Sequence, residues 1–185
     1  MNQKHIPYLL CLLLVCASSP LAGQSLEPEL DKVGKSVEGY FRQKRPGWEH
    51  STAPPATPPG SQPSPNVAIH FWSSEQCLTA EVIIDGVSSG KQAVPCRIKL
   101  AIYYSPSASE ARTGLSNFIF REQSARAVPV GDKGYVWGGS NLVFVKSKFT
   151  FWLGGGLDMR VGDFTYNGEF MERLAKEIAD AVPAT

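Results

Sequence analysis

Histidine is scarce in this 185-residue sequence, which limits both acid–base catalysis and metal binding. Three histidines occur, and His5 lies close to the N-terminus, so His50 and His70 are the two candidates. A structural zinc site uses four Cys or His ligands at characteristic spacing, and the available histidines and cysteines are too scattered for that pattern. We therefore expect no metal ion and no other cofactor, and we predict that His70 is a partly exposed strand residue.

An excess of charge of either sign is also absent. The chain has 18 basic and 17 acidic side chains, and no block of like charges stands out. Nucleic acid and anionic membrane surfaces attract basic patches, so neither is an expected partner. Hydrophobic residues make up 43% and charged residues 19% of the chain, which is the usual composition of a domain that builds a core.

No apolar run approaches the length of about 20 residues that a membrane-spanning helix needs. The run Leu9–Ala17 follows a basic start at Lys4 and precedes small residues up to Gly23. This order is typical of a signal peptide. We predict that residues 1–23 are a signal peptide cleaved near residues 22–25. The mature chain is then exported, periplasmic or secreted, and has no transmembrane span.

Export leaves few cysteines. Cys11 and Cys16 leave with the signal peptide, and Cys77 and Cys96 remain. Two thiols in an oxidising compartment permit one pairing, so we predict a disulfide between them. Closing a loop of this size stabilises a chain by roughly 3 kcal/mol on the chain-entropy model. The alternative is two separate buried thiols.

Two segments of contrasting composition precede the main domain. In residues 24–45 apolar side chains recur at helical spacing between charged ones, which predicts an amphipathic helix. The apolar stripe consists of Leu26, Leu30, Val33, Val37, Tyr40 and Phe41. Residues 46–66 are rich in proline and predict an extended linker or loop.

Residues 67–185 have the pattern of an α+β domain. Residues 67–72, 78–84 and 97–104 predict strands, and Ser107 begins a capping box for a helix. Further strands follow in residues 128–152. The run Gly154-Gly-Gly156 predicts a flexible connection to a last helix that Asn167 caps. We expect a mostly antiparallel sheet of about five or six strands with helices on both faces, an α/β/α sandwich. The two later helices are expected on one side and the N-terminal helix on the other.

Aromatic residues occur as adjacent pairs in these strands, for example Phe71-Trp72, Tyr103-Tyr104 and Phe151-Trp152. Neighbouring strand residues point to opposite faces, so both faces of the sheet carry rings. Helices covering both faces would explain this. The alternative is an open aromatic surface for a glycan or an envelope protein. Its candidate residues are Trp72, Tyr104, Trp137 and Trp152.

Complete catalytic motifs are missing. Gly86-Val-Ser-Ser-Gly90 fits the G-x-S-x-G pattern of serine hydrolases, but a strand rather than a helix follows it and no later His could act as base. Asp158 and Asp163 flank Arg160 and could form a carboxylate pair for acid–base chemistry. Charged residues in a surface loop explain the same pattern.

Three short segments resemble a known family. They are Gly131-Asp-Lys-Gly-Tyr135, Val143–Phe151, and Leu174–Ala179 in the last predicted helix. Residues 128–182 as a whole are similar to the C-terminal part of small exported bacterial domains of the PsbP/Mog1-like kind, which include sensor and lipoprotein domains. Gly134 stands where that pattern usually has Ala. The resemblance implies an α/β/α sandwich, often without catalysis, and assigns no functional residue.

These observations favour an exported, non-catalytic binding or accessory module of the cell envelope. A small secreted hydrolase with a site near His70 or Asp158/Asp163 is the alternative. It requires a pocket in which at least two titratable groups converge. A third possibility is a scaffold in which residues 46–66 hold the N-terminal helix away from the domain.

Overall fold

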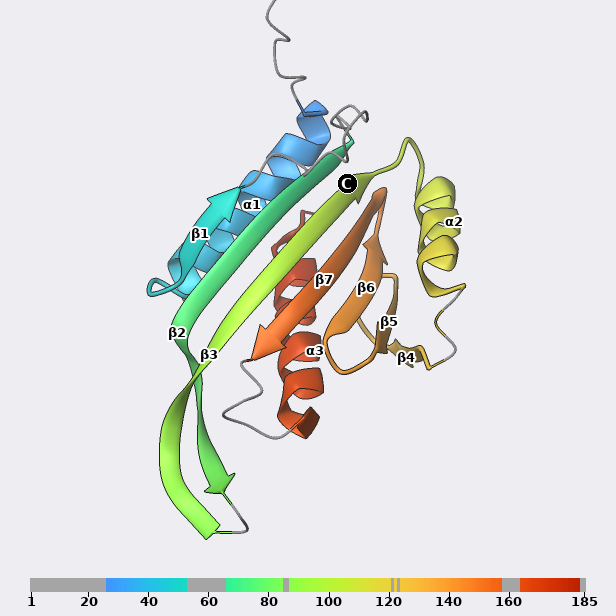
Figure 1. Cartoon of the computed structure of the whole chain (residues 1–185). Coiled ribbons are helices and arrows are strands. Elements are labelled where there is room, and N and C mark those ends of the chain that lie inside the picture. Colours follow the sequence, from blue (N-terminus) through green and yellow to red (C-terminus); the bar gives the residue numbers. More distant parts are fainter. Residues whose placement is uncertain are drawn as a thin grey trace, which may run out of the picture.

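The computed structural model describes residues 26–52, 66–84, 87–120, 122, 124–157 and 164–183. In these residues the chain forms one seven-stranded sheet and three helices (Figure 1). The predicted α+β class with an antiparallel sheet is confirmed, whereas the expected number of five or six strands was too low. The predicted signal peptide and both Asp158 and Asp163 lie outside the described residues.

The strand order is β1-β2-β3-β7-β6-β5-β4, and each neighbouring pair is antiparallel. The strands are β1 (Glu49–Thr52), β2 (Val67–Ile84), β3 (Val87–Tyr104), β4 (Arg126–Val128), β5 (Lys133–Trp137), β6 (Asn141–Lys146) and β7 (Phe149–Leu157). The helices are α1 (Pro28–Lys44), α2 (Ala108–Ile119) and α3 (Phe164–Ala181). Pairing of β3 with β7 joins the two sets of sequential hairpins into one sheet.

Two departures from the predicted strands have local causes. The short strand β1 lies in the segment predicted to be a linker, and it pairs with residues 70–73 of β2. Its sequence is polar throughout, so it carries no alternating apolar signal. The predicted strands 67–72 and 78–84 are both parts of β2. Ser73–Gln76 contains no Gly or Pro to reverse the chain, and a bulge after Ser74 accommodates the extra residues.

Helices α1 and α3 pack against the same face of the sheet and against each other (Figure 1). The stripe predicted for α1 is buried, since Leu30, Val33, Val37 and Phe41 are each at most 2% exposed. The N-terminal helix is therefore part of the core. The prediction that α2 and α3 share a face opposite α1 is wrong. Helical periodicity shows that one side of a helix is buried, but not which face of a sheet it covers.

Helix α2 packs on the opposite face, over β5, β6 and β7. Its buried Ala111 and Leu115 contact Val143 and Val145 of β6. The predicted cap at Ser107 is confirmed, because the Ser107 hydroxyl accepts a hydrogen bond from the backbone N–H of Glu110 at 3.2 Å. Figure 1 shows α2 at the β5–β6 end of the sheet, away from β1 and β2. Half of this face is therefore without a helix in the described part of the chain.

Strands β2 and β3 extend beyond the rest of the sheet as a two-stranded arm (Figure 1). A disulfide joins Cys77 and Cys96 at the base of this arm, with their Cα atoms 5.7 Å apart, which confirms the predicted pairing. Two strands alone have marginal stability in water. The disulfide links β2 to β3 close to where the pairing of β1 with β2 and of β7 with β3 ends.

The run Gly154–Gly156 belongs to β7 and is not the predicted flexible connection. Each glycine is needed for close packing. A Cβ on Gly155 would lie 2.2 Å from the carbonyl oxygen of Arg97, and one on Gly156 would lie 2.1 Å from Oδ1 of Asn167. Asn167 lies inside α3 and does not cap it. Its side chain accepts a hydrogen bond from the Leu157 N–H at 2.9 Å, which ties α3 to the end of β7.

Candidate functional site

The alternation of side chains along strands separates the four aromatic residues that were predicted to form one surface. Trp72 and Tyr104 lie on the face that α1 and α3 cover, where Trp72 is 3% exposed and the Tyr104 ring packs 5.7 Å from that of Phe149. Trp137 and Trp152 lie on the other face and pack beside the α2 cluster. The structure therefore does not bring these four side chains together.

The part of the second face that α2 leaves uncovered is a groove of about 630 Å³. It spans β1, β2, β3 and the middle of β7. The side chains that shape it on this face are Glu49, Ser51, Phe71, Arg97, Lys99 and Trp152. We call it the open-face groove.

Lys99 lies at the centre of the open-face groove between two aromatic rings. Phe71 is its direct cross-strand partner on β2, and Gly154 is its partner on β7. The Lys99 ammonium nitrogen is 5.9 Å from the centroid of the Phe71 ring and 5.5 Å from that of Trp152. A Cβ on Gly154 would lie 2.5 Å from Cη2 of Trp152. The indole therefore occupies the space over Gly154, next to Lys99.

Charges of both signs surround these rings. Arg97 is exposed on β3, two residues from Lys99 and on the same face, and neither cation forms a salt bridge with a described residue. Glu49 and Glu75, both exposed, lie on the β1–β2 side. A cation held over aromatic rings keeps its hydrogen-bond donors available. The groove therefore offers two aromatic rings, two cations that form no salt bridge with a described residue, and two carboxylates.

A second cluster, formed by His50, His70 and Glu38, lies between α1 and the β1–β2 edge. Nε2 of His50 is 3.1 Å from Nδ1 of His70, and Nδ1 of His50 is 3.7 Å from a Glu38 carboxylate oxygen. The prediction that His70 is partly exposed is wrong, because it is 6% exposed. Both imidazoles stack with the ring of Trp72. Pairing of β1 with β2 brings the two histidines together, and spacing in the sequence does not reveal it.

The histidine cluster is poorly suited to hydrolysis. Burial, and then the proximity of His50, lower the pKa of His70 to about 4, while Glu38 opposes the shift. The adjacent cavity of about 70 Å³ holds about two water molecules. No hydroxyl or thiol side chain lines it. Among the described residues, no group of three or more His, Cys, Asp or Glu side chains is arranged to hold a metal ion.

We expect His70 to make the free energy of unfolding depend on pH between about 6.5 and 4. Its pKa is depressed in the folded protein, so in this window the unfolded chain binds a proton that the folded chain does not. Stability should therefore fall by about 2–3 kcal/mol as the pH drops through this window, and His70 should contribute no further loss below it. Urea unfolding at a series of pH values measures the effect. The difference between wild type and His70→Gln isolates this residue, and parallel pH profiles for the two would contradict the prediction.

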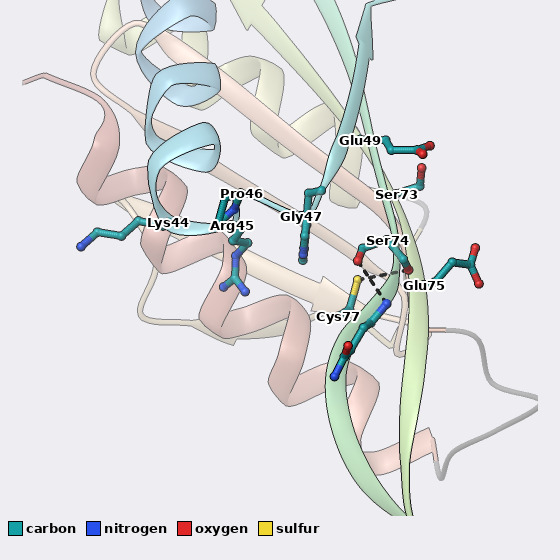
Figure 2. A pocket seen from close by; sticks show the side chains of 11 residues that line it. Lys44, Arg45, Pro46, Gly47, Glu49, Ser73, Ser74, Glu75 and Cys77 are labelled. Atoms are coloured by element: carbon teal, nitrogen blue, oxygen red, sulfur yellow. Dashed lines mark hydrogen bonds between the residues drawn. The ribbon is translucent and has the colours of Figure 1, made fainter.

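A third hollow, of about 530 Å³, lies where the chain turns from α1 into β1 (Figure 2). Its cation, Arg45, already donates a hydrogen bond to Glu177 at 2.6 Å and stacks over the Trp48 ring at 4.9 Å. Figure 2 shows Lys44 extending away from the hollow, and Glu49 and Glu75 on the other side of the strands from Arg45. With its cation already paired, this hollow is a weaker candidate than the open-face groove.

Comparison with known proteins finds no match for this chain: no protein-family model, no curated protein and no solved structure resembles it significantly. No helix in the described part of the chain has the length and apolar character to cross a membrane.

Proposed function

We propose that this protein is an exported, non-catalytic binding module of the cell envelope and that the open-face groove is its ligand site. The observation that supports this most is the half-covered sheet face, where Phe71 and Trp152 flank Lys99, which forms no salt bridge with a described residue. Ligand sites commonly combine apolar walls with a few polar groups that orient the ligand.

Four further features support this proposal. The predicted signal peptide implies export, and the Cys77–Cys96 disulfide suits an oxidising compartment. The resemblance of residues 128–182 to PsbP/Mog1-like exported domains implies an α/β/α sandwich, often without catalysis. The rings of Phe71 on β2 and Trp152 on β7 both line the groove, and saccharides or partner side chains can stack against such rings. We favour a glycan of the envelope as the ligand.

Co-sedimentation with purified peptidoglycan sacculi tests the proposal. We expect wild type to sediment with the sacculi and Phe71→Ala to bind about tenfold more weakly, since an aromatic contact contributes about 1–1.5 kcal/mol. Phe120→Ala is the matched control, because Phe120 is 86% exposed and lies outside the groove. Thermal unfolding establishes that both variants are folded. Failure of wild type to sediment, or equal binding by Phe71→Ala, contradicts the proposal.

The alternative of a small hydrolase has one observation in its favour. His70 does converge with His50 and Glu38, as a site near His70 requires. However, the cavity there is too small for a substrate, and no hydroxyl or thiol side chain lines it. The candidates Asp158 and Asp163 lie outside the described residues. We therefore rank this alternative below the binding module.

A further inference from the structure

We propose that the open-face groove binds a saccharide that carries carboxylates, such as the uronic acid units of an acidic polysaccharide. This inference rests on the proposed function, because it names the ligand class for the same groove. Three properties of the groove support it: the spacing of its two rings, the two cations between and beside them, and the carboxylates along one side.

The two aromatic rings are placed to contact two sugar units. Phe71 lies on β2 and Trp152 on β7, with β3 between them, so the two strands are about 10 Å apart. Pyranose rings present flat faces of C–H groups, and these faces stack on aromatic rings much as other apolar groups do. A ligand that uses both rings is therefore an oligosaccharide rather than a single sugar.

Lys99 and Arg97 are placed to bind an acidic group between those two sugar units. Lys99 lies between the rings, and Arg97 follows it on the same face of β3. Neither is neutralised by a salt bridge to a described residue. Hydrogen bonds from such cations to a carboxylate are about twice as strong as neutral ones. A neutral sugar could accept hydrogen bonds from both cations but would supply no counter-charge.

The acidic side of the groove distinguishes an acidic sugar from other anions. Glu49 and Glu75 lie on the β1–β2 side, and Ser51 and Ser73 lie on the same face beside them. Carboxylates accept hydrogen bonds from sugar hydroxyls, whereas a deoxyribose–phosphate backbone has no donors to offer them. Single-stranded nucleic acid also stacks on rings and binds cations, but it needs a groove that is basic along its whole length. This groove is basic on β3 only.

Isothermal titration calorimetry with tetragalacturonate tests the inference. The fully methyl-esterified tetramer is the uncharged control ligand, because it has the same sugar units without the charges. We expect wild type to bind the acidic form at least about tenfold more tightly than the ester, since a charged hydrogen bond contributes about 1.5–3 kcal/mol. Lys99→Met should reduce this preference by weakening the binding of the acidic form. Lys133→Met is the matched control, because Lys133 also lies over an aromatic ring, that of Tyr135 at 5.5 Å, but outside the groove.

Four results would overturn the inference. They are equal binding of acid and ester, no binding of either, the same effect from Lys99→Met and Lys133→Met, or tighter binding of an oligothymidylate of similar length. If any of these occurs while sedimentation with sacculi still depends on Phe71, the ligand class is wrong and the binding role stands. If the dependence on Phe71 also disappears, the proposed function fails as well.

Discussion

Replacing Phe41 with alanine is expected to lower the free energy of unfolding by about 3–5 kcal/mol, the usual cost of deleting a buried aromatic side chain. Phe41 is 1% exposed. Its ring centroid lies 4.7 Å from that of Trp72 on the sheet and 5.7 Å from that of Trp48. The substitution therefore leaves a cavity between α1 and the sheet that neighbouring elements cannot close without moving.

Urea denaturation followed by tryptophan fluorescence measures this loss, and Lys32→Ala is the control on the exposed side of α1. The control should change stability by less than about 0.5 kcal/mol. The comparison also tests the scaffold hypothesis, in which the N-terminal helix is held away from the domain. A Phe41→Ala loss as small as that of the control would favour the scaffold and would contradict the packing of α1 described above.

Gly156→Ala is expected to destabilise the protein by a similar amount, about 3–5 kcal/mol. Gly156 has φ +131°, a conformation that residues with a side chain adopt only with strain of about 1–3 kcal/mol. Its new Cβ would also displace the Asn167 side chain. That side chain bridges two elements, since it accepts from the Leu157 N–H and donates to the Gly139 carbonyl at 2.7 Å. Losing these buried hydrogen bonds costs about 1–3 kcal/mol more.

Gly168→Ala is the matched control, because a Cβ on Gly168 meets no atom within 4 Å. Gly168 lies within α3, where alanine is favoured over glycine by about 0.5–1 kcal/mol. Thermal unfolding of the two variants should therefore shift the melting temperature in opposite directions. If Gly156→Ala were as stable as wild type, the run Gly154–Gly156 would be the flexible connection that its composition suggests.

Features that depend on near neighbours in the chain were predictable from the sequence. The α1 stripe follows from helical spacing, and Ser107 followed by Glu110 is sufficient to locate the start of α2. The disulfide between Cys77 and Cys96 follows from the small number of cysteines in a chain expected to be exported. The helix stripe and the cap depend on residues within about four positions of one another, and each cysteine of the expected mature chain has only one possible partner.

The candidate site was only partly predictable. The pair Phe71-Trp72 indicated that one ring lies on each face, but not which face stays open. The predicted ligand residue, Trp72, is the ring that α1 buries. No sequence pattern identified Lys99 as a candidate site residue. It becomes part of the site only because the folded sheet places Phe71 and Trp152 on either side of it. His70 likewise gains its partner from the pairing of β1 with β2.

The sequence by itself determined the α+β class, the amphipathic stripes, the helix cap and the pairing of the cysteines, because these follow from periodicity, local hydrogen bonding and counting. Only the tertiary structure decided that α1 and α3 share a face while α2 covers half of the other. It also decided that β3 pairs with β7, which places Lys99 next to Gly154 and the Trp152 ring. Alternation along a strand assigns residues to opposite faces, but strand order and helix placement depend on how distant segments pack together.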